Sequence, residues 1–142
     1  MMIYLKLKKH LNLLIVIVLS LVSFWACTPD DDNENGDIRA EYVGSWTCSE
    51  QSSLFGQSTY SVTISYGPSD NTVLIYNLYN IGASEAVEVY LVDNSLELLN
   101  QTVDNNLFSG EGTSVVDYST FNLSYSVKSA GDQDQVSATF TQ

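Results

Sequence analysis

The stretch "YSVTISY", residues 60 to 66, decides the fold class, because its apolar and polar side chains alternate with a period of two. Such alternation is typical of a β-strand that buries one face and exposes the other. The same alternation returns in "FNLSYSV", residues 121 to 127, and in "VSATF", residues 136 to 140. No segment from residue 41 onward carries a helical period, so the chain is predicted to be an all-β protein.

Further strand candidates surround these three segments. They are "YVGSWTCSE" (42–50), "NTVLIYNLY" (71–79), "AVEVYLV" (86–92) and "SLELL" (95–99). Residues typical of turns separate the candidates, namely Gly67-Pro68, Asp70-Asn71, Gly82, Asp93-Asn94, residues 104–106, Gly110, Gly112 and Gly131-Asp132. Counting gives about eight short strands at the spacing of roughly 8 to 12 residues expected of a barrel or sandwich. The prediction is a small antiparallel meander barrel, with a β-sandwich as the alternative.

A resemblance to a known family supports the barrel. "YVGSW", which contains Gly44 and Trp46, resembles the Gly-x-Trp element at the first strand of lipocalins and other calycins. "VDYSTF", residues 116 to 121, resembles a second lipocalin motif between the sixth and seventh strands. The resemblance implies a lipocalin-like barrel in which Gly44 and Trp46 are structural, with Lys128 or Arg39 as the basic residue that this family packs over its tryptophan. At this length side chains largely fill such a barrel, so a roomy ligand pocket is not expected.

The first 26 residues have the layout of a secretion signal. A basic start, "MMIYLKLKKH", precedes the apolar run "LNLLIVIVLSLVSFW", and a small residue then precedes Cys27. "FWAC" resembles the lipobox of bacterial lipoproteins, which implies that Cys27 is acylated and becomes the first mature residue. Two or more acyl chains anchor a protein stably. The alternatives are a cleaved soluble protein and an uncleaved anchor helix, although the apolar run is shorter than the roughly 20 residues that span a bilayer.

Residues 27–40 are predicted to be a flexible acidic tether, because a segment of low hydrophobicity and high charge gains too little from ordering. Asp30, Asp31 and Asp32 follow Cys27 after Thr28 and Pro29. An acidic run at this place resembles the export signal of Bacteroidota lipoproteins. The whole predicted barrel, residues 41–142, is likewise similar to the small lipocalin-like lipoprotein domains of Bacteroidota, most of them without assigned function. Together these resemblances imply a lipid-anchored, surface-exposed protein of the outer membrane, with a periplasm-facing orientation as the alternative.

The same acidic run also matches part of an EF-hand calcium loop. Its candidate ligands are Asp31, Asn33, Asn35 and Asp37. The twelfth position, which requires a bidentate Glu, is Tyr42, and no helical pattern flanks the run. Calcium binding is therefore only a minor alternative, and no metal or other cofactor is predicted.

Charge and residue types exclude several kinds of chemistry. After residue 26 the chain carries all 17 acidic side chains but only Arg39 and Lys128 as basic ones, a formal charge of −15. This surface repels phosphate, so no nucleic-acid partner is predicted, and membrane attachment depends on the lipid. The single histidine, His10, lies in the signal, which leaves no imidazole for a Ser or Cys triad or for a usual zinc site. Cys48, beside Trp46 on the inward face, is predicted to be a buried, inert thiol.

A non-enzymatic binding or interaction module is the predicted function, recognising a glycan, a small apolar molecule or a protein. One alternative is a small carboxylate-dependent glycan hydrolase with a pair such as Glu85 and Glu88, or Glu97 and Asp104. The strand pattern disfavours it, because most acids fall in turns or on the outer face. A purely structural envelope lipoprotein is the other alternative.

Loops on a rigid scaffold are where recognition usually occurs. Two predicted loops offer an aromatic side chain among small polar residues, "SSLFGQS" around Phe55 and "NLYNIGAS" around Tyr79. These two aromatics are the candidate ligand-binding residues. The alternative is that they only cover the ends of the barrel.

Overall fold

Eight β-strands and two short 3-10 helices make up the part of the chain that this computed structural model describes, residues 36–115 and 117–142. The elements are η1 (Ile38–Glu41), β1 (Gly44–Ser52), β2 (Gly56–Tyr66), β3 (Thr72–Tyr76), η2 (Leu78–Asn80), β4 (Ala86–Val92), β5 (Ser95–Val103), β6 (Asn106–Ser114), β7 (Thr120–Ser129) and β8 (Asp132–Thr141). Each strand pairs antiparallel with the next along the chain, as in a series of hairpins. None of the described helices has the length and apolar character needed to cross a bilayer.

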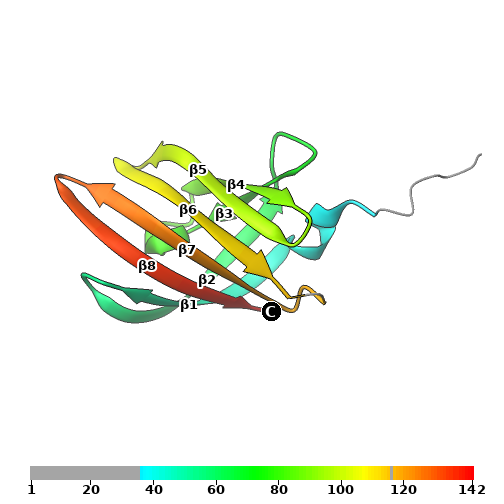
Figure 1. Cartoon of the computed structure of the whole chain (residues 1–142), viewed down its shortest axis with the longest axis horizontal. Helices are drawn as coiled ribbons and strands as arrows, with labels where there is room; N and C mark the ends of the chain where they lie inside the picture. The colour runs from blue at the N-terminus through cyan, green and yellow to red at the C-terminus, as the bar shows by residue number, and fades with distance from the viewer. Residues whose placement is uncertain (1–35, 116) are drawn as a thin grey trace, which may run out of the picture. The chain divides into compact units, whose positions relative to one another are not determined.

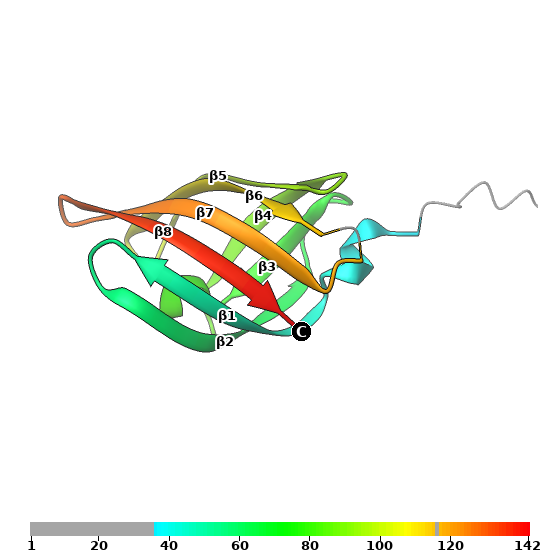
Figure 2. The same ribbon diagram turned by 60° about the horizontal axis from the view of Figure 1, so that its bottom comes forward.

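The sheet closes on itself because β1 pairs with β8 as well as with β2. Figures 1 and 2 show β8 lying beside β1 on the same wall. Closure gives every strand two neighbours and so reduces the unpaired backbone groups that an open sheet exposes, although β3 pairs only with residues 63–66 of β2. The predicted all-β meander barrel of about eight short strands is confirmed, and the alternative sandwich is wrong.

Side chains fill the interior of the barrel. The period of two seen in the sequence becomes the burial pattern of the strands, with Val62 and Ile64 inside on β2 and Phe121, Leu123 and Tyr125 inside on β7. The Phe121 and Phe140 rings stack with centroids 4.2 Å apart, and the Trp46 ring meets Phe121 edge-on at 5.0 Å. Such aromatic pairs stabilise a small core beyond the area they bury.

Strand β6 was not foreseen, because the sequence suggested turns at Gly110 and Gly112. Both glycines lie inside β6, directly opposite Tyr125 and Leu123 of β7. A Cβ atom at Gly110 would collide with the Ser124 carbonyl oxygen and the backbone of Tyr125, and one at Gly112 would collide with the Asn122 carbonyl oxygen. The glycines therefore serve the close approach of β6 to β7, a device that lets a sheet curve tightly.

The chain joins the barrel at the end that we call the entry end. There η1 packs Ile38 against the core, although residues 38–40 were assigned to the tether by sequence. Arg39 bonds Asp37 at 2.7 Å and the Ser69 carbonyl oxygen at 2.8 Å, and its guanidinium lies over the Tyr66 ring. Figures 1 and 2 show the C-terminus at this same end.

Trp46 also lies toward the entry end and is 1% exposed. Its indole N–H donates to the Tyr42 carbonyl oxygen at 2.7 Å, and the Tyr42 ring in turn contacts Tyr118 and Phe121. Gly44, two residues earlier, has a φ of +140°, a backbone conformation that favours glycine. Neither basic residue is found over Trp46: the Arg39 guanidinium lies over the Tyr66 ring, and Lys128 is exposed near the end of β7, so the Tyr42 carbonyl and the Phe121 ring are the observed contacts of the indole.

The opposite end of the barrel, which we call the distal end, carries four connections. They are the β1–β2 turn (53–55), the η2 segment (77–85), the β5–β6 turn (104–105) and the β7–β8 turn (130–131). In Figure 1 these connections lie on the side of the barrel away from the first described residues. Phe55 and Tyr79, the two candidate ligand-binding residues, both lie in connections at the distal end.

Candidate functional site at the distal end

The β1–β2 turn exposes two consecutive apolar side chains. Leu54 is 54% exposed and Phe55 is 78% exposed, and we call this pair the Leu54–Phe55 tip. The other large hydrophobic side chains that are exposed among the described residues are not neighbours in sequence; they are Tyr66, Val92, Leu99, Leu107 and Val115. Single exposed apolar residues are common on protein surfaces. The tip is therefore the feature of this surface that calls for an explanation.

A buried carboxylate holds the turn that carries the tip. Asp134 is 1% exposed and points inward from β8 toward the distal end. Its Oδ1 accepts hydrogen bonds from Ser53 N (2.9 Å), Ser53 Oγ (2.7 Å) and Leu54 N (3.1 Å). Its Oδ2 accepts from Ser52 Oγ (2.5 Å) and Tyr79 Oη (2.8 Å). We call Asp134 with Ser52, Ser53 and Tyr79 the Asp134 clamp.

The clamp leaves the turn little freedom. Ser52 Oγ, besides donating to Asp134, accepts hydrogen bonds from Leu54 N at 3.1 Å and Phe55 N at 2.8 Å. Every backbone N–H from Ser53 to Phe55 is thus bonded inward. Burying a carboxylate is costly unless it receives such bonds, and here five donors supply them. The result is a rigid turn that presents apolar side chains to the solvent.

Hydrogen bonding also sets the charge of the clamp. Burial raises the pKa of Asp134, but the donors Ser52, Ser53, Tyr79 and the Leu54 N–H together outweigh it and hold this pKa below its ordinary value. Burial and the adjoining Asp134 carboxylate raise the pKa of Tyr79 above its ordinary value. At neutral pH the carboxylate is therefore ionised and the phenol is protonated, as the observed donor and acceptor roles require.

Tyr79 supports the tip from inside. Its ring lies 6.3 Å from that of Phe55 and also contacts Phe108 and Tyr125 of the core, each edge-on. The η2 segment that carries it is strained, because Asn77, Tyr79 and Asn80 all have a φ between +55° and +66°. Asparagine tolerates this region, whereas a tyrosine in it needs compensation from its surroundings. Tyr79 N donates to Tyr60 Oη at 2.8 Å, which supplies part of that compensation.

A second buried carboxylate lies next to this arrangement. Glu50, 5% exposed on β1, accepts hydrogen bonds on Oε2 from Tyr60 Oη at 2.5 Å and Tyr125 Oη at 2.7 Å. Burial is the main cause that raises the pKa of Tyr60 and of Tyr125 far above the ordinary value, so both phenols remain donors. Tyr60 links the two carboxylates through Tyr79. The Tyr60 hydroxyl donates to Glu50 and accepts a hydrogen bond from the backbone N–H of Tyr79, whose own hydroxyl donates to Asp134.

The polar side chains of this network are bonded to one another. Cys48 is buried, and burial raises the pKa of its thiol to about 12, so it is not a nucleophile at neutral pH. Among the described residues, no group of three His, Cys, Asp or Glu side chains is placed to hold a metal ion. The bonds of Asp134 run to its own neighbours in the fold and organise the turn.

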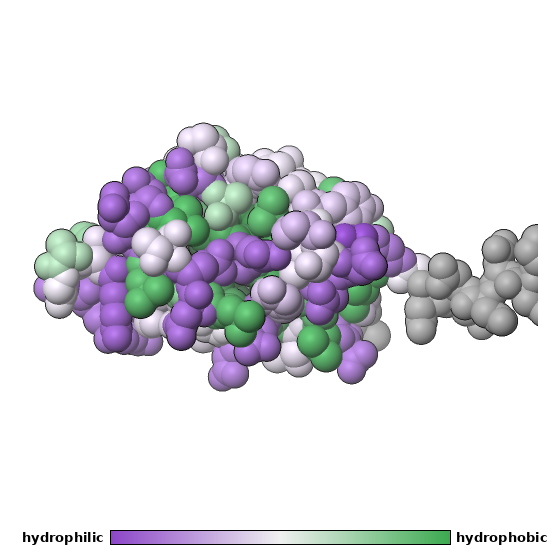
Figure 3. Space-filling model, turned by 90° about the horizontal axis from the view of Figure 1, so that it is seen from above, coloured by the Kyte–Doolittle hydropathy of each residue, from purple (hydrophilic) through white to green (hydrophobic). Residues whose placement is uncertain are grey.

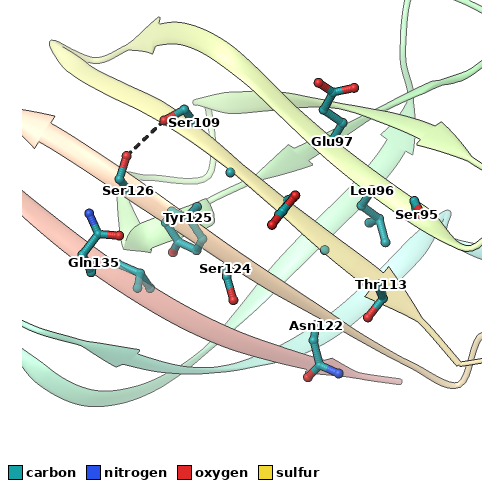
Figure 4. Close-up of a pocket in the computed structure, with 14 residues that line it drawn as sticks. Ser95, Leu96, Glu97, Ser109, Thr113, Asn122, Ser124, Tyr125, Ser126 and Gln135 are labelled. Atoms are coloured by element: carbon teal, nitrogen blue, oxygen red, sulfur yellow. Dashed lines mark hydrogen bonds between the residues drawn. The ribbon is translucent and has the colours of Figure 1, made fainter.

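A separate open groove of about 940 Å³ lies on the outer face of β5 to β8 (Figure 4). Its lining is Ser95, Leu96, Glu97, Ser109, Gly110, Glu111, Gly112, Thr113, Asn122, Ser124, Tyr125, Ser126, Gln135 and Val136. Leu96, Tyr125 and Val136 have their side chains buried in the core, so the exposed lining is polar. Glu97 lies directly opposite Glu111, and the hydroxyls of Ser109 and Ser126 are 3.0 Å apart. The groove offers hydrogen-bonding groups but no exposed apolar side chain.

Figure 3 shows the hydropathy of one face of the barrel. On the face shown in Figure 3, hydrophobic residues are scattered among hydrophilic ones and do not gather in one broad area.

The carboxylate pairs considered by sequence are not brought together in the outer groove of β5 to β8. Glu97 faces Glu111, whereas Asp104 lies in the β5–β6 turn at the distal end.

The two candidate residues predicted by sequence lie together at the distal end. Phe55 faces solvent, while Tyr79 is half-buried and its hydroxyl is engaged by Asp134, so its ring backs Phe55. The residues that hold them, Glu50 and Asp134, were not singled out by sequence. A signal was present, because extending the alternation from Trp46 along β1 and from Val136 back along β8 places both acids on the inward face.

Several other predictions concern residues outside the described ranges. Cys27, the signal 1–26, and the calcium-loop candidates Asp31, Asn33 and Asn35 all lie there. Asp37, the remaining candidate ligand of that loop, is described. Its carboxylate caps η1 and forms an ion pair with Arg39, which holds the pKa of Asp37 below its ordinary value.

The chain is similar to known proteins in its fold and not in its sequence. Neither a protein-family model nor a curated protein sequence matches the chain. One similar solved structure is a redesigned beta barrel, at a TM-score of 0.54 and 11% identity over 76% of this chain and 96% of that chain. Another is EF1p2_mFAP2b bound to DFHBI, at a TM-score of 0.51 and 12% identity over 75% of this chain and 97% of that one. These similarities support the lipocalin-like barrel fold and show the fold alone.

Proposed function

We propose that this protein is a lipid-anchored, non-enzymatic binding module of the bacterial cell envelope that recognises its ligand through the distal end. The observation that carries the binding role is Phe55, which is 78% exposed on a turn held rigidly by the Asp134 clamp. A fixed, exposed aromatic gains free energy when a partner buries it, and anchors of this kind dominate many interfaces. The barrel supplies the rigid scaffold.

The chemistry of the cysteine, histidine and buried carboxylates supports the non-enzymatic role. The only histidine, His10, falls in the predicted signal, and the thiol of Cys48 has a pKa of about 12. General acid–base and thiolate mechanisms need groups that titrate nearer to neutral pH. The buried carboxylates Glu50 and Asp134 are already bonded to tyrosine and serine hydroxyls.

The lipid anchor is proposed from the sequence. The basic start and the apolar run favour a secretion signal, and the resemblance of "FWAC" to the bacterial lipobox favours acylation at Cys27. The acidic run that follows favours the outer surface of the outer membrane over the periplasmic side, because it resembles the export signal of Bacteroidota lipoproteins. The chain joins the barrel at the entry end, so the tip lies at the end away from this join.

Replacing Cys27 with serine is expected to abolish metabolic labelling with radioactive palmitate and to move the protein from the membrane fraction to the soluble fraction. The acyl chains are the proposed attachment, and the acidic barrel has little affinity for anionic lipids by itself. Cys48→Ala is the control and should keep both the label and the membrane fraction. A Cys27→Ser protein that remains membrane-bound at the wild-type level would mean that residues 1–26 act as an anchor helix.

A Phe55→Ala variant is expected to lose at least about tenfold in retention of whatever ligand the wild-type protein binds, because it removes the most exposed anchor. The full-length lipoprotein in detergent is applied to a glycan array and to solubilised envelope proteins, alongside the variant. Glu111→Gln in the outer groove is the matched control and should leave retention unchanged. Equal retention by wild type and Phe55→Ala would exclude the tip as the site, and turnover of a retained glycan would contradict the non-enzymatic role.

A further inference from the structure

We infer that the Leu54–Phe55 tip docks into an apolar pocket of a protein partner whose rim carries basic side chains. The inference rests on the proposed function, because it names the class of partner for the same distal surface. Three features support this inference: the apolar character of the tip, its rigidity and the charge around it.

The tip has the wrong chemistry for a glycan. A sugar-binding site needs free polar groups that can form hydrogen bonds with the hydroxyls of the sugar. Here the protein hydroxyls and the carboxylate nearest the tip are already hydrogen-bonded within the fold. Ser52 Oγ donates to Asp134 and accepts from two backbone N–H groups, and Ser53 Oγ donates to Asp134 and accepts from Gln135 N at 3.0 Å. Tyr79 Oη also donates to Asp134. Leu54, beside Phe55, adds an aliphatic surface that fits an apolar pocket.

Free polar groups lie elsewhere on the barrel. The outer groove of β5 to β8 carries hydroxyl, amide and carboxylate side chains with no exposed apolar residue. The polar groove and the apolar tip are thus two separate surfaces. The separation argues that the tip is built for burial in a complementary apolar pocket.

The rigidity of the tip favours a preformed pocket. Ordering a loop on binding costs free energy that reduces affinity, and a loop that is already ordered avoids this cost. The Asp134 clamp fixes every N–H of the turn, and Tyr79 backs the Phe55 ring at 6.3 Å. A pair of fixed, adjacent apolar side chains resembles the central anchors of protein interfaces more than an adaptable lipid-inserting loop.

Charge argues for a basic rim and against a bilayer. The chain after residue 26 has a formal charge of −15, so anionic lipid repels it. At the distal end Asp104 and Asp132 are exposed in or beside turns, with Lys128 as the basic residue of that end. Complementary charges around an apolar centre steer association and fix register. A partner with Lys or Arg around its pocket therefore fits this end.

The test places a photo-crosslinker in the full-length protein in living cells. Leu54→p-benzoylphenylalanine keeps Phe55 in place, and the same residue at Ser124 of the groove or at Asp117 of the entry end gives two matched controls. We expect a discrete protein adduct from position 54 only, identified by mass spectrometry. With that partner purified, Phe55→Ala should weaken binding about 100-fold. The double variant Asp104→Lys, Asp132→Lys should weaken it about tenfold, and added salt should do so as well.

Other occupants give different results. A glycan retained in a Phe55-dependent manner, a lipid adduct together with binding to phosphatidylethanolamine and phosphatidylglycerol vesicles, or an adduct between two copies of this chain would each overturn the inference while the tip remains a binding site. A purified partner whose binding survives Phe55→Ala would overturn it too. If no glycan, lipid or protein engages the tip, both the inference and the proposed function fail.

Discussion

Replacing Asp134 with alanine is expected to lower the free energy of unfolding by about 3 to 5 kcal/mol, a large share of the stability of a small domain. The substitution removes the acceptor of five hydrogen bonds, donated by Ser52, Ser53, Leu54 and Tyr79. A buried donor left without a partner costs about 1 to 3 kcal/mol, and these costs are not additive. The turn that presents Phe55 should lose its order at the same time.

Urea unfolding followed by tryptophan fluorescence measures this change. Asp132→Ala, two residues away on the same strand but exposed, is the control and should change stability by no more than about 0.5 kcal/mol. If Asp134→Ala does not fold, Asp134→Asn keeps the shape and one acceptor oxygen and should show a smaller loss of the same kind. Equal stability of the Asp132 and Asp134 variants would mean that the clamp does not hold the turn.

Acid should reveal the same carboxylate. The pKa of Asp134 is lower in the folded state than its ordinary value near 3.8. Its charged form therefore stabilises the fold fully above about pH 5, and this contribution is lost as the pH falls through the folded pKa. The stability difference between wild type and Asp134→Asn should be constant from pH 5 to 7 and shrink below about pH 4. A difference that grows on acidification would mean that burial, and not hydrogen bonding, sets the pKa.

Replacing Gly112 with alanine is expected to cost about 3 kcal/mol, the upper end of the usual range for overpacking. The added Cβ would collide with the Asn122 carbonyl oxygen of β7, which is backbone and has no rotamer by which to move away. The two strands would have to separate where Leu123 packs into the core opposite this glycine. The pairing of β6 with β7, and with it the curvature of the wall, should weaken.

The same urea experiment measures this loss. Gly36→Ala is the matched control, because a Cβ at Gly36 meets no atom within 4 Å and its φ lies outside the left-handed region. That variant should unfold at the wild-type midpoint. A midpoint for Gly112→Ala that equals the Gly36→Ala midpoint would show that β6 and β7 are not in close contact at this position.

Local pattern was sufficient for the fold class. Alternation in residues 60–66 and 121–127 requires two-faced strands, and a chain with many such strands must pair them to satisfy its backbone groups. It was misleading for β6, because glycine in a sequence resembles a turn. Gly110 and Gly112 lie within a strand for a reason that involves β7, which the local sequence of β6 does not contain.

The candidate site was predicted in part. Phe55 and Tyr79 were recognisable as aromatics in polar loops, because each property belongs to its own segment. Their packing against one another depends on how the barrel closes, as does the different exposure of the two rings. The sequence showed that each residue is an aromatic in a polar loop, but it did not show which side chain each ring packs against.

The charge of the chain, its all-β class and the absence of histidine after His10 were determined by the sequence alone, since they depend on composition and local order. The Asp134 clamp and the Glu50–Tyr60–Tyr125 network were decided only by the tertiary structure. Their members come from β1, β2, β7, β8 and the turns at the distal end, and a hydrogen bond depends on distances between atoms that the linear order does not contain. Closure of the sheet between β1 and β8 brings Ser52 to Asp134. The hydrogen bond between them helps to hold the turn in the conformation that exposes the Leu54–Phe55 tip.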